Sequence, residues 1–296
     1  MLGSLAAAPW LAGTAGRYAS GRGGDVLVPD SGAQDTPPLA PGTPMSPERM
    51  ALIEAFKQHA ADVDAGFEAR THTGAWAMPY RLFQPAASGR HPLVIYLHGS
   101  GGLGTDNQKQ MATGNIFGTR VWALPEHQRQ FPCFVLAPQT DRGWANYGEP
   151  APGDSVARVV DGVGDGVATA LLIIDQLLSE LPIDARRVYV TGQSMGGLGV
   201  WNMLAHRPAF FAAAVPCCGS AGPERVSTLA NVPIWNFHGD ADKTVPVAVS
   251  RERMAALRAA GGRPLHTEYA GVGHNAWEWA YTEPALLPWM FARVRR

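Results

Sequence analysis

A serine held between two glycines is the clearest chemical signal in the chain. Ser194 lies in the G-x-S-x-G sequence of residues 192–196, which directly follows the β-branched run at 188–191. A chain that turns sharply from strand to helix exposes the serine hydroxyl, and side chains at positions 192 and 196 would collide across that turn. The spacing therefore predicts a nucleophilic serine. A purely structural strand-to-helix turn is the alternative.

A serine needs a general base before it becomes a good nucleophile. Of the nine histidines, His274 lies in the loop Gly-Val-Gly-His-Asn at 271–275, directly after a predicted strand at 265–269. Open α/β sheets place their chemistry at the carboxyl ends of the strands. We therefore expect His274 to be the base, with a structural loop histidine as the alternative. His98 and His238 each precede a glycine at a strand end, and we expect them to brace loops.

Two aspartates compete to orient the histidine. Asp240 and Asp242 both follow the predicted strand at 233–238. Asp240 lies close to the strand end, where aspartates commonly close a turn. Asp242 lies further along the loop, so we expect it to be the third member of a Ser-Asp-His set, with Asp240 as the fallback. The acid then falls between nucleophile and base in chain order.

Acyl transfer also needs two backbone N–H donors for the oxyanion that develops. Met195 directly follows the nucleophile and is expected to supply one. The glycine-rich loop at 98–102 is expected to supply the other, from Ser100 as first choice or Gly101 as second. This loop lacks the spacing of a dinucleotide or P-loop motif, which argues against nucleotide binding.

The elements around these residues alternate between strand and helix. We predict a helix over 46–64, two strands within 67–84, and a closing helix from Pro284. The other predicted strands are 93–97, 134–137, 188–191, 212–216, 233–238 and 265–269, and the other helices are 167–181, one after Ser194, and 250–260. This order is typical of an α/β fold with a mostly parallel sheet and helices on both faces. No helix-length insertion for a large lid is evident.

Composition narrows the function classes. The chain has 296 residues, a formal net charge of −1, 46% hydrophobic and 17% charged residues, which argues against nucleic-acid binding and wholesale disorder. Its three cysteines cannot form a disulfide framework, and free buried thiols are expected. We see no metal-ligand spacing, no cofactor motif and no apolar run long enough for a membrane span.

The N-terminal residues differ from the rest. Residues 1–45 are rich in glycine, proline and small residues, and we expect a flexible leader before a single catalytic domain at 46–296. Residues 1–16 are compatible with a signal-peptide remnant, although the basic n-region is absent. A signal peptide would imply a periplasmic or secreted protein, and its absence a cytoplasmic one.

Together these motifs resemble the α/β-hydrolase superfamily, and within it the carboxylesterase/phospholipase and polyhydroxybutyrate-depolymerase-like esterases, some of them labelled predicted peptidases. The matching segments are LVIYLHGSGG, VLAPQ, RVYVTGQSMGGLGVW, FAAAVPCCG, PIWNFHGDADKTVPV and GVGHNAWEWAY, within about residues 75–295. The order Ser194, Asp242, His274 matches the order in the superfamily. The resemblance implies an α/β-hydrolase fold, but it leaves out residues 1–45 and does not identify the substrate.

Substrate-lining residues are expected close to these motifs. The resemblance implies that the segment after VLAPQ lines the cleft, which points to Arg142 and Trp144. Trp277, three residues after His274, and Gln193, beside the nucleophile, are further candidates. Aromatic walls suit apolar or aryl acyl groups. The alternative is that these tryptophans only pack helices onto the sheet.

The predicted function is therefore a serine hydrolase that cleaves small or polymeric carboxylic esters through an acyl-enzyme on Ser194. The first rival is an amide hydrolase with the same triad, either a peptidase or a polyamide hydrolase for substrates such as poly(aspartic acid). In that case Lys109, Arg120 and Arg142 could neutralise substrate carboxylates. The second rival is a non-catalytic binding module on the same fold. Oligomeric state is not indicated.

Overall fold

A single sheet of eight strands organises the described part of the chain. The computed structural model describes residues 45–58, 60–146, 162–220 and 226–295. The strands are β1 (Phe67–His72), β2 (Met78–Phe83), β3 (His91–Leu97), β4 (Phe134–Pro138), β5 (Ile183–Gln193), β6 (Ala213–Cys217), β7 (Trp235–Gly239) and β8 (Leu265–Tyr269). Their spatial order is β1-β2-β4-β3-β5-β6-β7-β8. The predicted leader and the signal-peptide hypothesis lie almost wholly outside the described residues.

The sheet is parallel from β4 to β8. Strands β1 and β2 form an antiparallel hairpin, and β2 also pairs antiparallel with β4. Strand β7 joins β6 through the residue pair Cys217 and Phe237 and an isolated bridge between Ala214 and Ile234, whereas β7 and β8 pair along their whole length. Because β3, β5, β6, β7 and β8 run in one direction, the loops after them meet at one edge.

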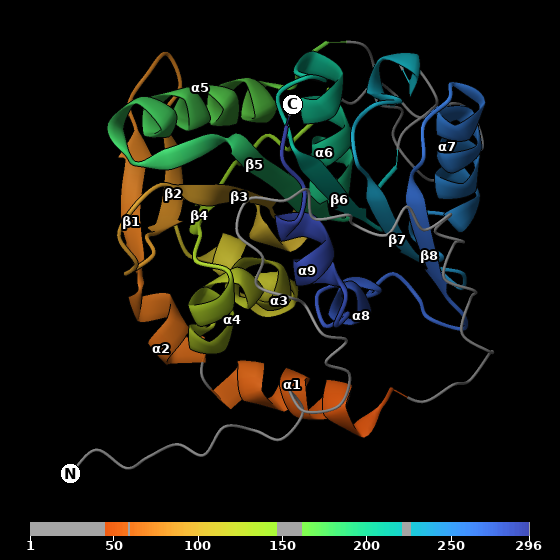
Figure 1. Ribbon diagram of the computed structural model, residues 1–296, viewed down its shortest axis with the longest axis horizontal. Coiled ribbons are helices and arrows are strands. Elements are labelled where there is room, and N and C mark those ends of the chain that lie inside the picture. Colours follow the sequence, from red (N-terminus) through yellow and green to blue (C-terminus); the bar gives the residue numbers. More distant parts are fainter. Residues whose placement is uncertain (1–44, 59, 147–161, 221–225, 296) are drawn as a thin grey trace, which may run out of the picture.

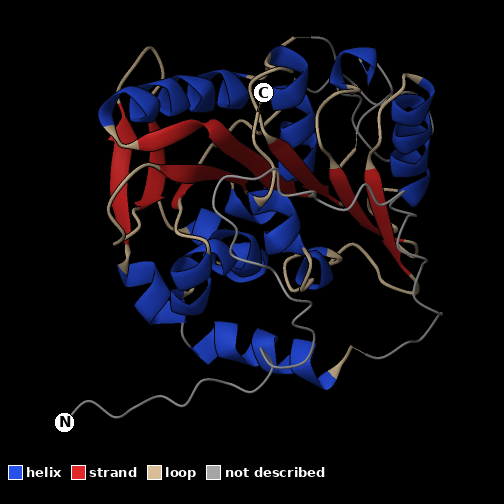
Figure 2. Cartoon of the chain, viewed as in Figure 1, coloured by secondary structure: helices blue, strands red, loops and turns tan. Residues whose placement is uncertain are grey.

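Helices cover both faces of this sheet, as Figures 1 and 2 show. Helices α5 (Asp165–Glu180), α6 (Met195–His206) and α7 (Val247–Ala259) lie on one face. The opposite face carries α1 (Pro47–Gln58), α2 (Ala60–Ala65), α3 (Ile116–Arg120), α4 (Pro125–Gln130), α8 (Trp277–Ala280) and α9 (Leu286–Phe291). The predicted α/β fold with a mostly parallel sheet is confirmed.

Each face has its own apolar core, because successive side chains of a strand point to opposite sides. Ile95 of β3 packs in the core beneath α5, α6 and α7, whereas its neighbours Val94 and Tyr96 pack against α1, α3 and α9. All three side chains are fully buried. Near-continuous apolar strands such as β3 are therefore a direct consequence of the two covered faces.

Helices α1 and α2 lie where the helix over 46–64 was expected. Two other parts of the chain differ from the prediction. Strand β5 starts at Ile183 instead of 188, because its partly exposed first half contains Asp184, Arg186 and Arg187, which hide the apolar pattern. Between β3 and β4 the chain forms short helical turns and the helices α3 and α4, for which no prediction was made.

Candidate active site

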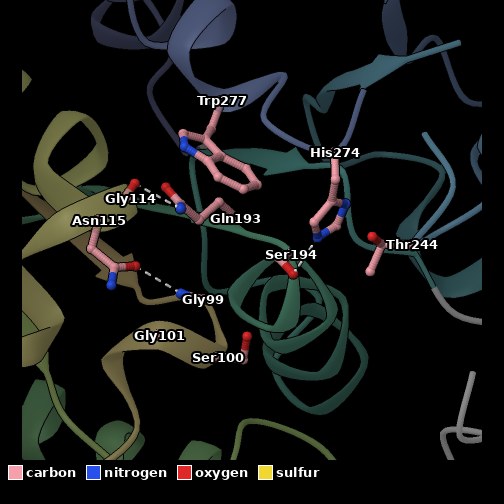
Figure 3. A pocket seen from close by; sticks show the side chains of 10 residues that line it. All are labelled: Gly99, Ser100, Gly101, Gly114, Asn115, Gln193, Ser194, Thr244, His274 and Trp277. Carbon is pink, nitrogen blue, oxygen red and sulfur yellow. Dashed lines mark hydrogen bonds between the residues drawn. The ribbon is translucent and has the colours of Figure 1, made fainter. Parts of the chain in front are cut away.

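Ser194 lies at the sharp turn between β5 and α6. Its backbone has φ +53° and ψ −119°, a strained conformation for a residue with a side chain, and its amide donates to the carbonyl of Cys217 at 2.9 Å. The turn tolerates little bulk: a Cβ atom at Gly196 would lie 1.9 Å from the Leu97 carbonyl oxygen. The strand-to-helix turn predicted from the sequence is therefore present, with its hydroxyl in a pocket (Figure 3).

A continuous chain of hydrogen bonds links Ser194 to two residues from the last loops of the sheet. The Ser194 Oγ atom lies 2.7 Å from Nε2 of His274, and Nδ1 of His274 lies 2.7 Å from Oδ2 of Asp242. Asp242 follows β7 and His274 follows β8, so parallel strand ends bring together residues that are far apart in sequence. Between the two aspartates weighed in the sequence, the structure places Asp242 against the histidine.

Asp240 has a different role. Its Oδ1 atom accepts a hydrogen bond of 2.6 Å from the amide of Gly271 and so links the loop after β7 to the loop after β8. This loop-closing contact is the kind expected for an aspartate close to a strand end.

The carboxylate of Asp242 is fully buried and surrounded by donors. Oδ1 accepts the amides of Thr244 at 2.8 Å and Val245 at 2.9 Å, and Oδ2 lies 3.2 Å from Nε2 of His238 as well as next to His274. Burial raises the pKa of Asp242, but the hydrogen bonds from both histidines and both amides outweigh it and hold the pKa well below its usual range. Asp242 is therefore a fixed negative charge beneath His274.

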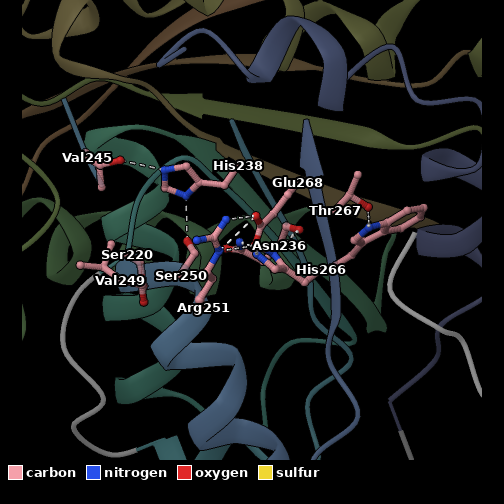
Figure 4. A network of polar contacts seen from close by, with 11 residues as sticks. Ser220, Asn236, His238, Val245, Val249, Ser250, Arg251, His266, Thr267 and Glu268 are labelled. Atoms are coloured by element: carbon pink, nitrogen blue, oxygen red, sulfur yellow. Dashed lines mark hydrogen bonds and ion pairs between the residues drawn. The ribbon is translucent and has the colours of Figure 1, made fainter. Parts of the chain in front are cut away.

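His238 is itself held in place (Figure 4). Its Nε2 atom lies 2.9 Å from the Val245 carbonyl, which can only accept a hydrogen bond, so Nε2 carries the hydrogen. Its Nδ1 atom then accepts from the Ser250 hydroxyl at 2.8 Å. His98 is similarly fixed: Nδ1 donates to the Gly99 carbonyl at 2.7 Å, and Nε2 accepts the Thr140 amide at 3.2 Å. The prediction that both histidines brace loops is confirmed.

The glycine-rich loop after β3 faces Ser194. Ser100–Gly102 form a short 3₁₀ turn in which the first internal bond runs from the Gly102 amide to the Gly99 carbonyl. The amides of Ser100 and Gly101 therefore have no partner within the turn, and both residues line the pocket. Met195 is the first residue of α6, so its amide has no partner within that helix either. These are the three donors predicted for an oxyanion.

Behind this loop lies a buried polar network that the sequence did not reveal. Asn115 accepts hydrogen bonds at its Oδ1 from the Gly99 amide at 2.9 Å and from the Tyr96 hydroxyl at 3.0 Å. Tyr96 also reaches Oε1 of Gln193 at 2.9 Å, and Nε2 of Gln193 donates to the Gly114 carbonyl at 2.8 Å. Asn115 lies in a stretch without helix or strand periodicity, so no pattern singled it out.

The pocket around Ser194 has a volume of about 260 Å³. The described residues that line it include no lysine, arginine, aspartate or glutamate. They are Gly99, Ser100, Gly101, Gly114, Asn115, Gln193, Ser194, Thr244, His274 and Trp277. Gln193 and Trp277 therefore lie where the sequence analysis expected them. The rings of Trp277 and His274 meet edge to face, with centroids 5.4 Å apart.

Two expected lining residues lie elsewhere, which corrects the prediction. Trp144 is fully buried, its Nε1 donates to the His98 carbonyl at 2.9 Å, and it packs against Gly199 of α6. It therefore supports the loop from behind. The Arg142 guanidinium lies 4.2 Å from the ring centroid of Trp76 and 3.3 Å from Oδ2 of Asp165. Neither residue lines the pocket.

The described residues hold no group of three or more histidine, cysteine, aspartate or glutamate side chains that could bind a metal. The three cysteines are buried and free, as expected. In the part of the chain that the structure describes, every helix is too short or too polar to cross a membrane.

Comparisons with known proteins agree with this geometry. A family model described as phospholipase/carboxylesterase matches residues 80–281. A protein named "Putative esterase NocK" from Nocardia uniformis subsp. tsuyamanensis is 26% identical over 251 residues, which cover 81% of this chain and 68% of that protein.

Solved structures with a similar fold include esterases. The crystal structure of a thermostable esterase is 34% identical with a TM-score of 0.71, and the match covers 79% of this chain but only 64% of that one. A ferulic acid esterase, at 16% identity and a TM-score of 0.57, shares the fold over 76% of this chain and 98% of its own.

Proposed function

Because the chain belongs to the phospholipase/carboxylesterase family of α/β-hydrolases, we propose that it is a serine esterase in which Ser194, His274 and Asp242 form the catalytic triad. The observation that carries this proposal is the unbroken hydrogen-bonded chain from Ser194 Oγ through His274 to the buried Asp242. A serine on a sharp turn, an imidazole within reach and a buried carboxylate are the arrangement that nucleophilic acyl transfer requires.

The proposed reaction has two halves. Ser194 Oγ attacks the ester carbonyl carbon while His274 Nε2 takes its proton, and the resulting oxyanion is stabilised by the amides of Met195 and of Ser100 or Gly101. His274 then gives this proton to the leaving alcohol as the C–O bond breaks, which leaves an acyl group on Ser194. Water, deprotonated by His274, attacks this acyl-enzyme and releases the carboxylic acid.

Asp242 acts by holding His274 in place. It accepts the Nδ1 hydrogen, which leaves Nε2 free to take the serine proton, and its charge stabilises the imidazolium that forms. Its own pKa is far below the working range, so it stays ionised throughout the cycle.

The charge distribution supports esters over acidic polyamides. The cations considered for binding substrate carboxylates are already paired: Lys109 lies 3.2 Å from Asp106, Arg120 lies 2.6 Å from Asp64, and Arg142 lies 3.3 Å from Asp165. The described pocket lining carries no lysine or arginine of its own. A polyanionic substrate would therefore meet no compensating charge beside Ser194.

The test is Ser194→Ala, assayed with p-nitrophenyl acetate and a matched pair of ester and amide substrates. We expect folded protein with turnover reduced by at least about 10³-fold, and loss of labelling by a fluorophosphonate probe. Ser179→Ala is the matched control, because Ser179 is an exposed residue of α5 whose hydroxyl donates to the Gln176 carbonyl of the same helix. Full activity or labelling in Ser194→Ala would refute the triad, and faster turnover of the amide than of the ester would favour an amidase.

A further inference from the structure

Part of the pocket beside Ser194 lies between three segments that are distant in sequence: the turn at Gly114, the end of β5 and the start of α8. We call the space bounded by Gly114, Gln193 and Trp277 the acyl slot. Figure 3 shows Trp277, Gln193 and Gly114 together on one side of Ser194, while Thr244 and the imidazole of His274 lie toward the other side. The slot therefore opens directly onto the Ser194 hydroxyl.

We propose that this slot receives the acyl group of the ester and limits the enzyme to short, uncharged acyl chains, with Gly114 and Trp277 setting the limit. The inference rests on the proposed esterase function. His274 must protonate the leaving oxygen, so the alcohol belongs on the side of His274 and Thr244. The acyl substituent, on the other side of the carbonyl carbon, then points toward Gly114 and Trp277.

The slot offers no charge, and the indole N–H of Trp277 is its buried polar side-chain group without a partner among the described residues. Nε2 of Gln193 is occupied by the Gly114 carbonyl and its Oε1 by the Tyr96 hydroxyl. Asn115, beside them, uses Oδ1 for Gly99 and Tyr96 and Nδ2 for the Lys109 carbonyl at 3.2 Å. A charged acyl group would lose its water without meeting an opposite charge, and a polar one could gain only the indole N–H of Trp277. An apolar chain against the Trp277 ring has no such penalty.

The dimensions set the length limit. The whole pocket is about 260 Å³, which is smaller than the roughly 300–1,000 Å³ of sites for drug-sized ligands. A Cβ atom added at Gly114 would lie 3.5 Å from Cζ2 of Trp277 and 3.6 Å from Nε2 of Gln193. These are ordinary van der Waals distances, so Gly114 and Trp277 nearly touch and close the end of the slot that lies away from Ser194. A methyl group at position 114 fits the fold and shortens the slot.

Two opposite substitutions follow from this geometry. Gly114→Ala shortens the slot, whereas Trp277→Phe removes the indole atoms that face Gly114 and lengthens it. Trp277→Phe also removes an indole N–H that is buried without an acceptor among the described residues, so loss of that group leaves no polar atom unpaired. An aromatic ring remains beside His274 in this variant.

The measurement is kcat/KM for p-nitrophenyl acetate, butyrate, hexanoate and octanoate, expressed as the ratio of each ester to acetate. A disturbance of the triad affects all these esters alike and cancels in the ratio. For wild type we expect the ratio to fall beyond butyrate. Gly114→Ala should lower the hexanoate-to-acetate ratio by at least about tenfold, and Trp277→Phe should raise it, since one methylene against an apolar wall changes specificity by about 10–200-fold.

A second series, acetate esters of alcohols of increasing length, separates the acyl side from the alcohol side. Unchanged acyl ratios in both variants, or a response confined to the alcohol series, would overturn the slot assignment. Either result would leave hydrolysis of p-nitrophenyl acetate and its dependence on Ser194 intact, so it would not count against the proposed function. Thermal unfolding monitored by circular dichroism verifies that each variant is folded.

Discussion

Nε2 of His238 lies 3.2 Å from Oδ2 of Asp242, the same carboxylate oxygen that accepts the hydrogen bond of His274. His238, near the end of β7, and His274, in the loop after β8, therefore contact the same carboxylate oxygen. His238 does not touch the pocket, so any effect it has on the reaction passes through Asp242.

Replacing His238 tests this positioning role. We expect His238→Ala to lower kcat by about tenfold to a hundredfold with little change in KM, because a hydrogen bond to a charged group contributes about 1.5–3 kcal/mol. His238→Gln, whose amide nitrogen can take the place of Nε2, should restore most of kcat. If His238→Ala lost stability without any change in kcat, or if kcat fell equally in His238→Ala and His238→Gln, His238 would have a role in folding alone.

Asp242 and Asp240 give a matched pair of substitutions. Asp242→Asn removes the charge beneath His274 and presents a donor to Nδ1, and we expect kcat to fall by about 10⁴-fold. Asp240→Asn weakens only the bond to the Gly271 amide and should change kcat by less than about tenfold. Steady-state kcat values with one ester compare the two variants. A larger loss of kcat in Asp240→Asn than in Asp242→Asn would make Asp240 the carboxylate of the triad.

Asn115 is expected to position the oxyanion loop. Asn115→Ala removes the acceptor for the Gly99 amide, so the loop that carries Ser100 and Gly101 loses its tie to the segment after it. We predict a fall in kcat of about tenfold at nearly constant KM, because the oxyanion exists only after attack. Tyr96→Phe removes one further bond to Asn115 and should have a smaller effect. An increase in KM alone would point to substrate binding instead.

His98 makes stability depend on pH. Burial lowers the pKa of His98 to about 4, against about 6.5 in an unfolded chain. Between these pH values, His98 binds a proton in the unfolded chain but not in the folded protein. The stability that depends on neutral His98 is therefore fully present above pH 6.5 and is lost as the pH falls toward 4. We expect the free energy of unfolding to drop by about 2 kcal/mol more between pH 7 and pH 5 in wild type than in His98→Gln.

Urea unfolding at the two pH values measures this difference. Burial also lowers the pKa of His127 and His266, but these residues are unchanged in the variant and their contribution cancels. Equal pH dependence in both proteins would show that His98 is not the group concerned.

The parts of the molecule that could be predicted are those with a local signature. Strands such as β3 are almost continuously apolar because both faces are covered, and the turn at Ser194 is marked by a motif of five consecutive residues, although the contact that requires Gly196 is with Leu97 of β3. His274 follows from the same logic, since strand ends of a parallel sheet converge. Each of these inferences needs only the residues within one or two elements.

The failures involve contacts between distant segments. Trp144 was expected in the cleft because it is large, aromatic and close in sequence to a strand end, but its position depends on the space left by Gly199, 55 residues away. Asn115 and Gly114 belong to short turns whose geometry is set by tertiary packing and not by periodicity. The double role of Asp242, which contacts two histidines, likewise appears only when β7 and β8 are side by side.

The short pairing between β6 and β7 affects the order in which activity and secondary structure are lost on heating. Ser194 and the loop at Ser100 follow the central strands β5 and β3, whereas Asp242 and His274 follow the outer pair β7 and β8, which joins the rest of the sheet through few backbone pairs. An outer pair held this way is expected to open before the central strands do. On warming, turnover should therefore disappear a few degrees before the far-ultraviolet circular dichroism changes, and should return on cooling as long as the central strands have not melted.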